Sequence, residues 1–148
     1  MKKLLFILLF PLISMAQSQV DVMAGYKAVE VNYFLRTESL NYGLGVSLVD
    51  SGLVEKRANN NDIFYDHKFT QSYTPAVFAL VGGQFEEISI VGKLGSAYVE
   101  QQINGVPDSK HLFLAVGIEI GYDLSERFGV KGSFDNVNSL MAGLIIRL

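Results

Sequence analysis

Apolar side chains recur at every second position in short runs that cover most of the chain after residue 19. The clearest run spans Leu112 to Leu124, where the even positions are apolar or aromatic. The odd positions after Phe113 are small or acidic. A period of two places the two sets on opposite faces of a β-strand, whereas a helix would mix them. The pattern therefore predicts an all-β fold of antiparallel strands with one apolar face.

The first 16 residues are typical of a secretory signal peptide. Two lysines precede an apolar stretch from Leu4 to Ile13, and small residues including Ala16 follow it. The stretch is too short to span a bilayer as a helix. Without cysteine, neither a lipid anchor nor a disulfide is available. We expect residues 1–16 to be removed and residues 17–148 to form one domain.

The charge of the exported part argues against one class of partner. Removing the two N-terminal lysines from twelve basic residues leaves ten against fifteen acidic residues, a formal charge of −5. No basic stripe follows the chain, so nucleic acid is not an expected partner.

Turn residues divide the chain into eight candidate strands, most of them near the length of a tilted transmembrane strand. They are 19–26, 28–37, 40–50, 73–86, 88–101, 111–124, 128–135 and 139–148. The apolar positions change from even to odd near Lys27, which indicates a tight turn or a bulge, and the even strand count of a closed barrel favours the turn. Phe78 and Leu80 would face inward if Phe85 faces outward. A bulge at Gly82–Gly83 that resets this pattern is an open alternative.

The connections alternate in length. Those at 37–40, 86–88 and 124–128 are minimal, whereas those at 51–72 and 102–110 are long. Short turns on one rim and long loops on the other are typical of outer-membrane barrels, with the short turns in the periplasm. The sequence predicts an eight-stranded antiparallel up-and-down transmembrane β-barrel and disfavours a soluble sandwich.

Aromatic residues on the apolar face gather at the two ends of the strands. Two aromatic rings are expected where a barrel meets the two membrane interfaces. Beside the short turns the residues are Tyr42, Phe85, Tyr122 and Phe128, and beside the opposite rim they are Tyr26, Tyr73, Tyr98 and Phe134.

If the apolar faces point outward, charged residues collect inside. The inward set is Lys27, Glu30, Arg36, Lys93, Glu119, Asp123, Lys131, Asp135 and Arg147. Charges in a narrow lumen must pair with one another, so a lumen plugged by a charge network is predicted. Its members are expected to be Glu30, Arg36, Lys93, Glu119, Lys131 and Arg147. We expect Glu119 to pair with Lys93 or Lys131.

The chain resembles the small eight-stranded outer-membrane barrels typified by the OmpA transmembrane domain and OmpX. The resemblance covers residues 17–148 and rests on strand count, alternation and the closing segment, whose outward positions are Leu140, Ala142, Leu144, Ile146 and Leu148. Family members usually end in Phe, where this chain has Leu148. The resemblance implies a monomer in the outer membrane of a Gram-negative bacterium, in contact with outer-membrane lipid and the barrel-assembly machinery.

Few residues suggest chemistry. Asp62, Asp66 and His67 could hold a cation, but a solvated loop explains them better, and we expect neither metal nor cofactor. Some eight-stranded barrels modify lipid A, and Ser109 and His111 lie two residues apart with Glu100 nearby. Their order is Ser-x-His where the deacylase pattern is His-x-Ser. We therefore expect no catalytic residues and no enzyme.

The long segment 51–72 is the expected site of external function. We expect it to extend the third and fourth strands as a hairpin, with Asp62, Phe64, Tyr65 and His67 as its interaction residues. A protruding strand edge could receive an extracellular protein by strand addition. The predicted role is structural or surface interaction. The alternatives are a secreted periplasmic protein binding a small apolar ligand and a lipid A-modifying barrel enzyme.

Overall fold

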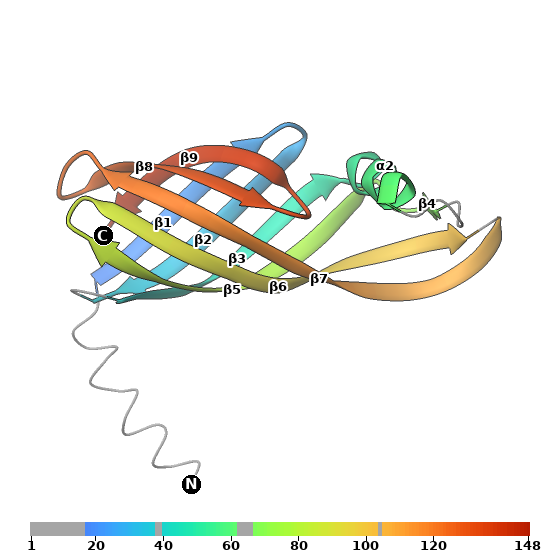
Figure 1. Ribbon diagram of the computed structural model, residues 1–148, viewed down its shortest axis with the longest axis horizontal. Helices are drawn as coiled ribbons and strands as arrows, with labels where there is room; N and C mark the ends of the chain where they lie inside the picture. The colour runs from blue at the N-terminus through green and yellow to red at the C-terminus, as the bar shows by residue number, and fades with distance from the viewer. Residues whose placement is uncertain (1–16, 38–39, 62–66, 104) are drawn as a thin grey trace, which may run out of the picture.

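The computed structural model describes residues 17–37, 40–61, 67–103 and 105–148. Within these residues, eight long antiparallel strands close into a barrel (Figure 1). They are β1 (Gln17–Gly25), β2 (Ala28–Arg36), β3 (Leu40–Asp50), β5 (Tyr73–Phe85), β6 (Ile88–Ile103), β7 (Val106–Asp123), β8 (Phe128–Asp135) and β9 (Ser139–Arg147). Each strand pairs with the next, and β9 pairs with β1 to complete the ring. The predicted eight-stranded fold is confirmed.

The change of phase near Lys27 is a tight turn. Gly25 pairs with Ala28, and Lys27 has a φ of 57° in the turn between them. The expectation that Lys27 faces the lumen is wrong. Its side chain is half exposed at the rim and contacts Asp50 Oδ2 at 3.3 Å.

Strand β5 carries apolar residues into the lumen without a bulge. Its pairing with β3 and β6 shows no register shift, so the alternative of a bulge at Gly82–Gly83 is wrong. Phe78 and Leu80 are 2% and 0% exposed, whereas Phe85 is 64% exposed. The lumen therefore contains large apolar side chains as well as charges.

The outer face of the wall is apolar and accessible. Val116, Ile118 and Ile120 are 42%, 47% and 54% exposed, while Ala115 and Glu119 on the opposite face of the same strand are fully buried. Of the predicted aromatic rings, Tyr42 and Tyr98 are half buried and the other members are exposed. The wall is thus apolar on its outer face while charged side chains are buried inside it, whereas a soluble protein exposes its charges.

The segment 51–72 does not form the expected hairpin. Residues Ser51–Asn61 form helix α2, and strand β4 (His67–Phe69) pairs with the outer part of β6. The helix begins here because Asp50 Oδ1 accepts a hydrogen bond from the backbone N–H of Gly52, and good helix formers follow. Residues 62–66 lie outside the described part of the chain.

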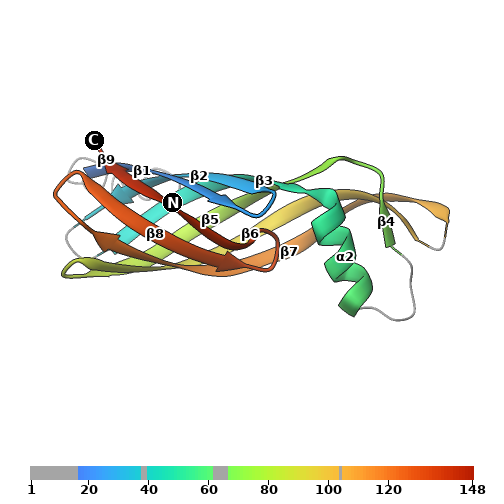
Figure 2. The same cartoon turned by 90° about the horizontal axis from the view of Figure 1, so that it is seen from above.

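The hairpin that projects beyond the rim belongs to β6 and β7. The expected long loop at 102–110 is wrong, because β6 continues to Ile103 and β7 starts at Val106. Gly105 takes a φ of 76° in the tight connection. Figure 2 shows this hairpin extending past α2, at the end of the barrel opposite the short turns. In the described residues, no helix is long and apolar enough to cross a membrane.

Candidate functional site

Charged side chains inside the barrel form a network with two lysines at its centres, and Lys93 is the first of these centres. Its amine lies 2.7 Å from both carboxylate oxygens of Glu30 and 2.8 Å from Asp135 Oδ2. The side chains of all three residues are fully buried. The amine also lies 4.3 Å from the centre of the Phe78 ring, a cation–π contact. One buried cation is thus surrounded by two carboxylates and an aromatic face.

Lys131 forms the second centre of the network. Its amine donates to Glu119 Oε2 at 2.9 Å and to Asp21 Oδ2, and it lies 4.3 Å from the centre of the Phe34 ring. Glu119 also lies 3.6 Å from the Lys93 amine, so its carboxylate joins the two centres. The structure thus places Glu119 between both of the cations that were considered as its partner.

A third group of charges closes the rim that carries the short turns. Asp123 accepts hydrogen bonds from Arg36 at 3.1 Å and from Gln84 at 3.2 Å, and it forms an ion pair with Arg147. Arg147 also donates to the carbonyl oxygen of Ser125 at 2.9 Å. Arg36 and Arg147 therefore belong to this rim and not to the two lysine centres.

Sequence reasoning missed three members of the network. Asp21 is fully buried on β1, where the alternation beside the outward Val22 could have placed it inside. Asn32 donates to both Glu30 and Glu119 at 2.9 Å. Asn138 lies in the β8–β9 turn and donates to Glu30 at 2.9 Å, a contact that no local sequence signal reveals.

The carboxylates around the two lysine centres have their hydrogen bonds satisfied. Each of the eight oxygens accepts at least one hydrogen bond from an amine, an amide or the backbone; the four residues are Asp21, Glu30, Glu119 and Asp135. Buried charges are stable only with such compensation. A lumen filled in this way gives no support to the alternative prediction of a periplasmic protein that binds a small apolar ligand in its interior.

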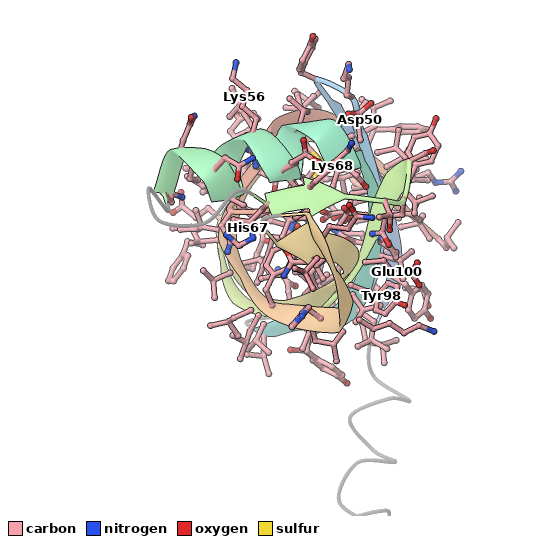
Figure 3. The ribbon with its side chains drawn as sticks, turned by 90° about the vertical axis from the view of Figure 1, so that its right-hand side faces the viewer. Asp50, Lys56, His67, Lys68, Tyr98 and Glu100 are labelled. Atoms are coloured by element: carbon pink, nitrogen blue, oxygen red, sulfur yellow. The ribbon has the colours of Figure 1, made fainter. Side chains whose placement is uncertain are left out.

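The outer end of the barrel contains a cavity of about 520 Å³. Helix α2 and strand β4 lie together across this end of the barrel, as Figure 3 shows, with Lys56 pointing away from it. The lining comes from α2, β4, the outer parts of β6 and β7, and the β8–β9 turn. It consists of Val54, Arg57, Ala58, Asn61, His67, Phe69, Val99, Gln101, His111, Leu112, Phe113, Phe134, Asp135, Asn136 and Ser139.

Helix α2 is fixed over the cavity by hydrogen bonds at both ends. At its start, the N–H of Ser51 donates to the carbonyl oxygen of Ser72 at 3.0 Å. Further along, Arg57 donates to the carbonyl oxygen of Val137 at 2.7 Å, and Asn59 exchanges two hydrogen bonds with the backbone of His67. The helix therefore links β3, β4 and the β8–β9 turn.

Among the predicted interaction residues, His67 is the one that the structure describes. It lies on β4, where its Nδ1 is 3.0 Å from Gln101 Oε1, and it lines the cavity. Asp62, Phe64 and Tyr65 lie outside the described residues.

Within the described residues, the structure does not bring together the side chains considered as a lipid A hydrolase site, which are Ser109, His111 and Glu100. His111 lies on the inward face of β7, opposite Val99, and lines the cavity. Glu100 lies on the outward face of β6, where it accepts a hydrogen bond from the Tyr98 hydroxyl at 2.7 Å. The side chain of Ser109 is outside the described set. In that set there is also no group of three residues able to hold a metal ion.

No protein-family model and no curated protein matches this sequence. Among solved structures, the chain is similar to the Yersinia pestis outer membrane protein Ail in a phospholipid bilayer nanodisc. The TM-score is 0.50 at 13% identity, over 90% of this chain and 99% of that chain. The chain has the fold of the small eight-stranded outer-membrane barrels.

Two crystal structures are also similar, at lower TM-scores. One is Ail in complex with the heparin analogue sucrose octasulfate, with a TM-score of 0.42 at 13% identity over 89% of this chain and 91% of that chain. The other is Neisserial surface protein A, with a TM-score of 0.43 at 13% identity over 90% and 94% of the two chains. At this identity the likeness concerns the fold.

Proposed function

We propose that this chain is a monomeric, non-enzymatic outer-membrane protein of a Gram-negative bacterium that presents an interaction surface outside the cell. Residues 1–16 serve as its export signal. The observation that carries the location is the reversed distribution of polarity: Ile118 and its outward neighbours are exposed, while Lys93 and Glu30 are buried. Such a wall is stable where hydrocarbon surrounds it.

The interior favours a structural or interaction role over solute transport. The two lysine centres and the large apolar residues Phe34, Phe78 and Leu80 occupy the lumen. An eight-stranded barrel has an interior just wide enough for side chains to fill. We therefore propose that the lumen is plugged and that function lies on the outer surface.

The projecting hairpin offers an open strand edge. On β7, pairing with β8 begins at Gly117, so the outer half of β7 has a strand neighbour on the β6 side alone within the described residues. The backbone N–H and C=O of Val116 point away from β6, since both form hydrogen bonds with Asn136. Backbone groups of a strand point to the same side at every second residue, so the N–H of Lys110, six residues from Val116, also points away from β6 to the open side.

An open edge of this kind binds an extended peptide by strand addition. We propose that the edge of β7 from Val106 to Lys110 receives a segment of an extracellular protein. The segment 51–72, where the sequence suggested this contact, is thereby replaced by the β6–β7 hairpin, because residues 51–61 form a helix.

The location is tested by alkaline extraction of membranes and by gel mobility. The protein is expected to stay with the membrane pellet and to migrate differently before and after boiling in SDS, because a closed ring has no unpaired strand to open. Release into the soluble fraction, or identical mobility of refolded protein, would overturn the proposal.

The strand edge is tested with two substitutions at one position. Lys110→Pro removes the open N–H and is expected to abolish capture of an extracellular partner, while Lys110→Ala removes the side chain and keeps the N–H. Partner capture is measured by crosslinking on intact cells, with heat-modifiable mobility as the folding control. Equal capture by the two variants would show that the backbone edge is not the binding surface.

A further inference from the structure

We infer that the cavity beneath α2 holds the acyl chain of an outer-leaflet lipid, which enters sideways between Leu112 of β7 and Phe134 of β8. This inference rests on the proposed outer-membrane location. It concerns a site separate from the β7 edge, because the entrance lies nearer the barrel than Lys110.

The barrel wall is open at this place. Pairing between β7 and β8 ends at Gly117 and Asp135, although β7 continues outward for eleven more residues to Val106. Asn136 closes the lower boundary of the opening, since its side chain donates to the carbonyl oxygen of Leu114 at 2.9 Å and accepts from the N–H of Val116 at 2.8 Å. Beyond Asn136, residues of the outer face and residues of the inner face line the same cavity.

The lining connects the lipid-facing surface with the inside. Leu112 and Phe134 point outward and are 73% and 59% exposed, so bilayer lipid reaches both of them. Val99 and Phe113 line the same cavity from the inner face of the hairpin, and Val54 and Phe69 line it from α2 and β4. An acyl chain can therefore reach the cavity along these apolar side chains, which share the lining with polar residues such as Arg57 and His111.

The volume and depth of the cavity suit this guest. A cavity of about 520 Å³ lies in the range of about 300–1,000 Å³ that is usual for small-molecule sites. Leu112 pairs in register with Tyr98, an outward tyrosine at the outer rim. Tyrosines of this kind sit at headgroup depth, which places the entrance where lipid chains begin.

Three polar side chains of the lining have hydrogen-bond partners within the protein. His67 Nδ1 lies 3.0 Å from Gln101 Oε1, and Arg57 donates to the carbonyl oxygen of Val137 at 2.7 Å. Asp135 accepts from the N–H of Val137 at 2.9 Å. An apolar guest would leave none of these three groups without a hydrogen bond, which lowers the penalty of placing hydrocarbon beside polar residues.

The chain contains no tryptophan, so a single introduced tryptophan reports on its own surroundings. Phe113→Trp places the reporter in the cavity, Ile120→Trp places it on the lipid face, and Phe78→Trp places it in the lumen. Each variant is refolded into vesicles of dioleoyl phosphatidylcholine or of the analogue brominated in its acyl chains. Bromine quenches tryptophan on contact.

We expect the brominated lipid to quench Phe113→Trp to an extent comparable with Ile120→Trp, and to leave Phe78→Trp bright. Filling the cavity with Ala58→Phe should reduce the quenching of Phe113→Trp and leave that of Ile120→Trp unchanged. If Phe113→Trp does not fold, Phe69→Trp supplies a second reporter in the same cavity.

Two results would overturn the inference in distinguishable ways. Quenching of Ile120→Trp without quenching in the cavity would reject the lipid site and leave the membrane location intact, and quenching of the cavity reporter by aqueous iodide alone would identify a water-filled cavity. No quenching of Ile120→Trp would reject the membrane location, and the lipid site with it.

Discussion

The lumen and the outer end of the barrel both enclose polar side chains, yet they differ in what surrounds those side chains. Around Lys93, carboxylate oxygens approach to 2.7 Å and the Phe78 ring to 4.3 Å. At the outer end, Arg57 and His67 bond to the protein on one side and line a cavity of about 520 Å³ on the other. The comparison teaches that polar residues fill the space around them in the lumen, whereas at the outer end they leave a cavity beside them.

The largest effect is expected from removing the central cation of the lumen. Lys93→Met leaves Glu30 and Asp135 as buried carboxylates without their amine, and it should lower the free energy of unfolding by about 3–5 kcal/mol. Urea unfolding in lipid vesicles, followed by heat-modifiable mobility, measures the change.

The double variant Lys93→Met with Glu30→Gln should be less destabilised than the sum of the single variants, because the second change removes a stranded charge. If the losses in free energy of unfolding were strictly additive, the two side chains would not act as a pair. The lumen would then differ less from the outer end of the barrel.

A charge on the lipid face should have the next largest effect. Ile118→Arg exposes a guanidinium to hydrocarbon and should lower stability by about 2–4 kcal/mol if the position lies near the midplane. Ala115→Ser, on the inward face of the same strand, should be milder. The same urea titration compares the two, and a harmless Ile118→Arg beside a damaging Ala115→Ser would reverse the assigned faces.

Loss of the helix anchor should act locally. Arg57→Ala removes charged hydrogen bonds from α2 to the β8–β9 turn, so opening of α2 should become easier by about 1.5–3 kcal/mol while the barrel remains closed. Hydrogen exchange of α2 amides measures the opening. Lys56→Ala, on the exposed side of the same helix, is the matched control, and equal exchange in both variants would contradict the anchoring role.

The smallest effect is expected at the rim. Lys27 and Asp50 lie 3.3 Å apart with side chains 50% and 34% exposed, in contrast to the fully buried pair of Lys93 and Glu30. Lys27→Gln should change stability by about 0–1 kcal/mol, because water and salt screen an exposed pair. If Lys27→Gln lowered the free energy of unfolding as much as Lys93→Met, burial would not explain the difference between the rim pair and the lumen pair.

The wall could be predicted from the sequence because each of its strands repeats one local rule. Alternation places Val116 outside and Glu119 inside without reference to any distant residue. The tight turn at Lys27 followed from the change of phase and the even strand count. Lys27 itself was misplaced, because the alternation of side chains stops where the strand ends.

The outer end could not be predicted in the same way. Segment 51–61 contains helix signals, since Asp50 precedes good helix formers, but the turn-rich Asn59-Asn60-Asn61 that follows suggested a hairpin tip. The cavity depends on contacts between α2, β4 and the β8–β9 turn, which are far apart in the chain. The contact of Arg57 with Val137 spans 80 residues.

The pairing of β1 with β9 has a consequence for how the protein is made. Gln19 lies opposite Arg147, so the last seam of the ring joins strands from the two ends of the described chain. Synthesis must therefore deliver β9 before the ring can close, and until then the backbone groups of β1 that face β9 are unpaired. A contact of such long sequence separation forms slowly. The apolar strands are prone to aggregate during this interval, so we expect dilution or lipid to raise the yield of the closed ring on refolding.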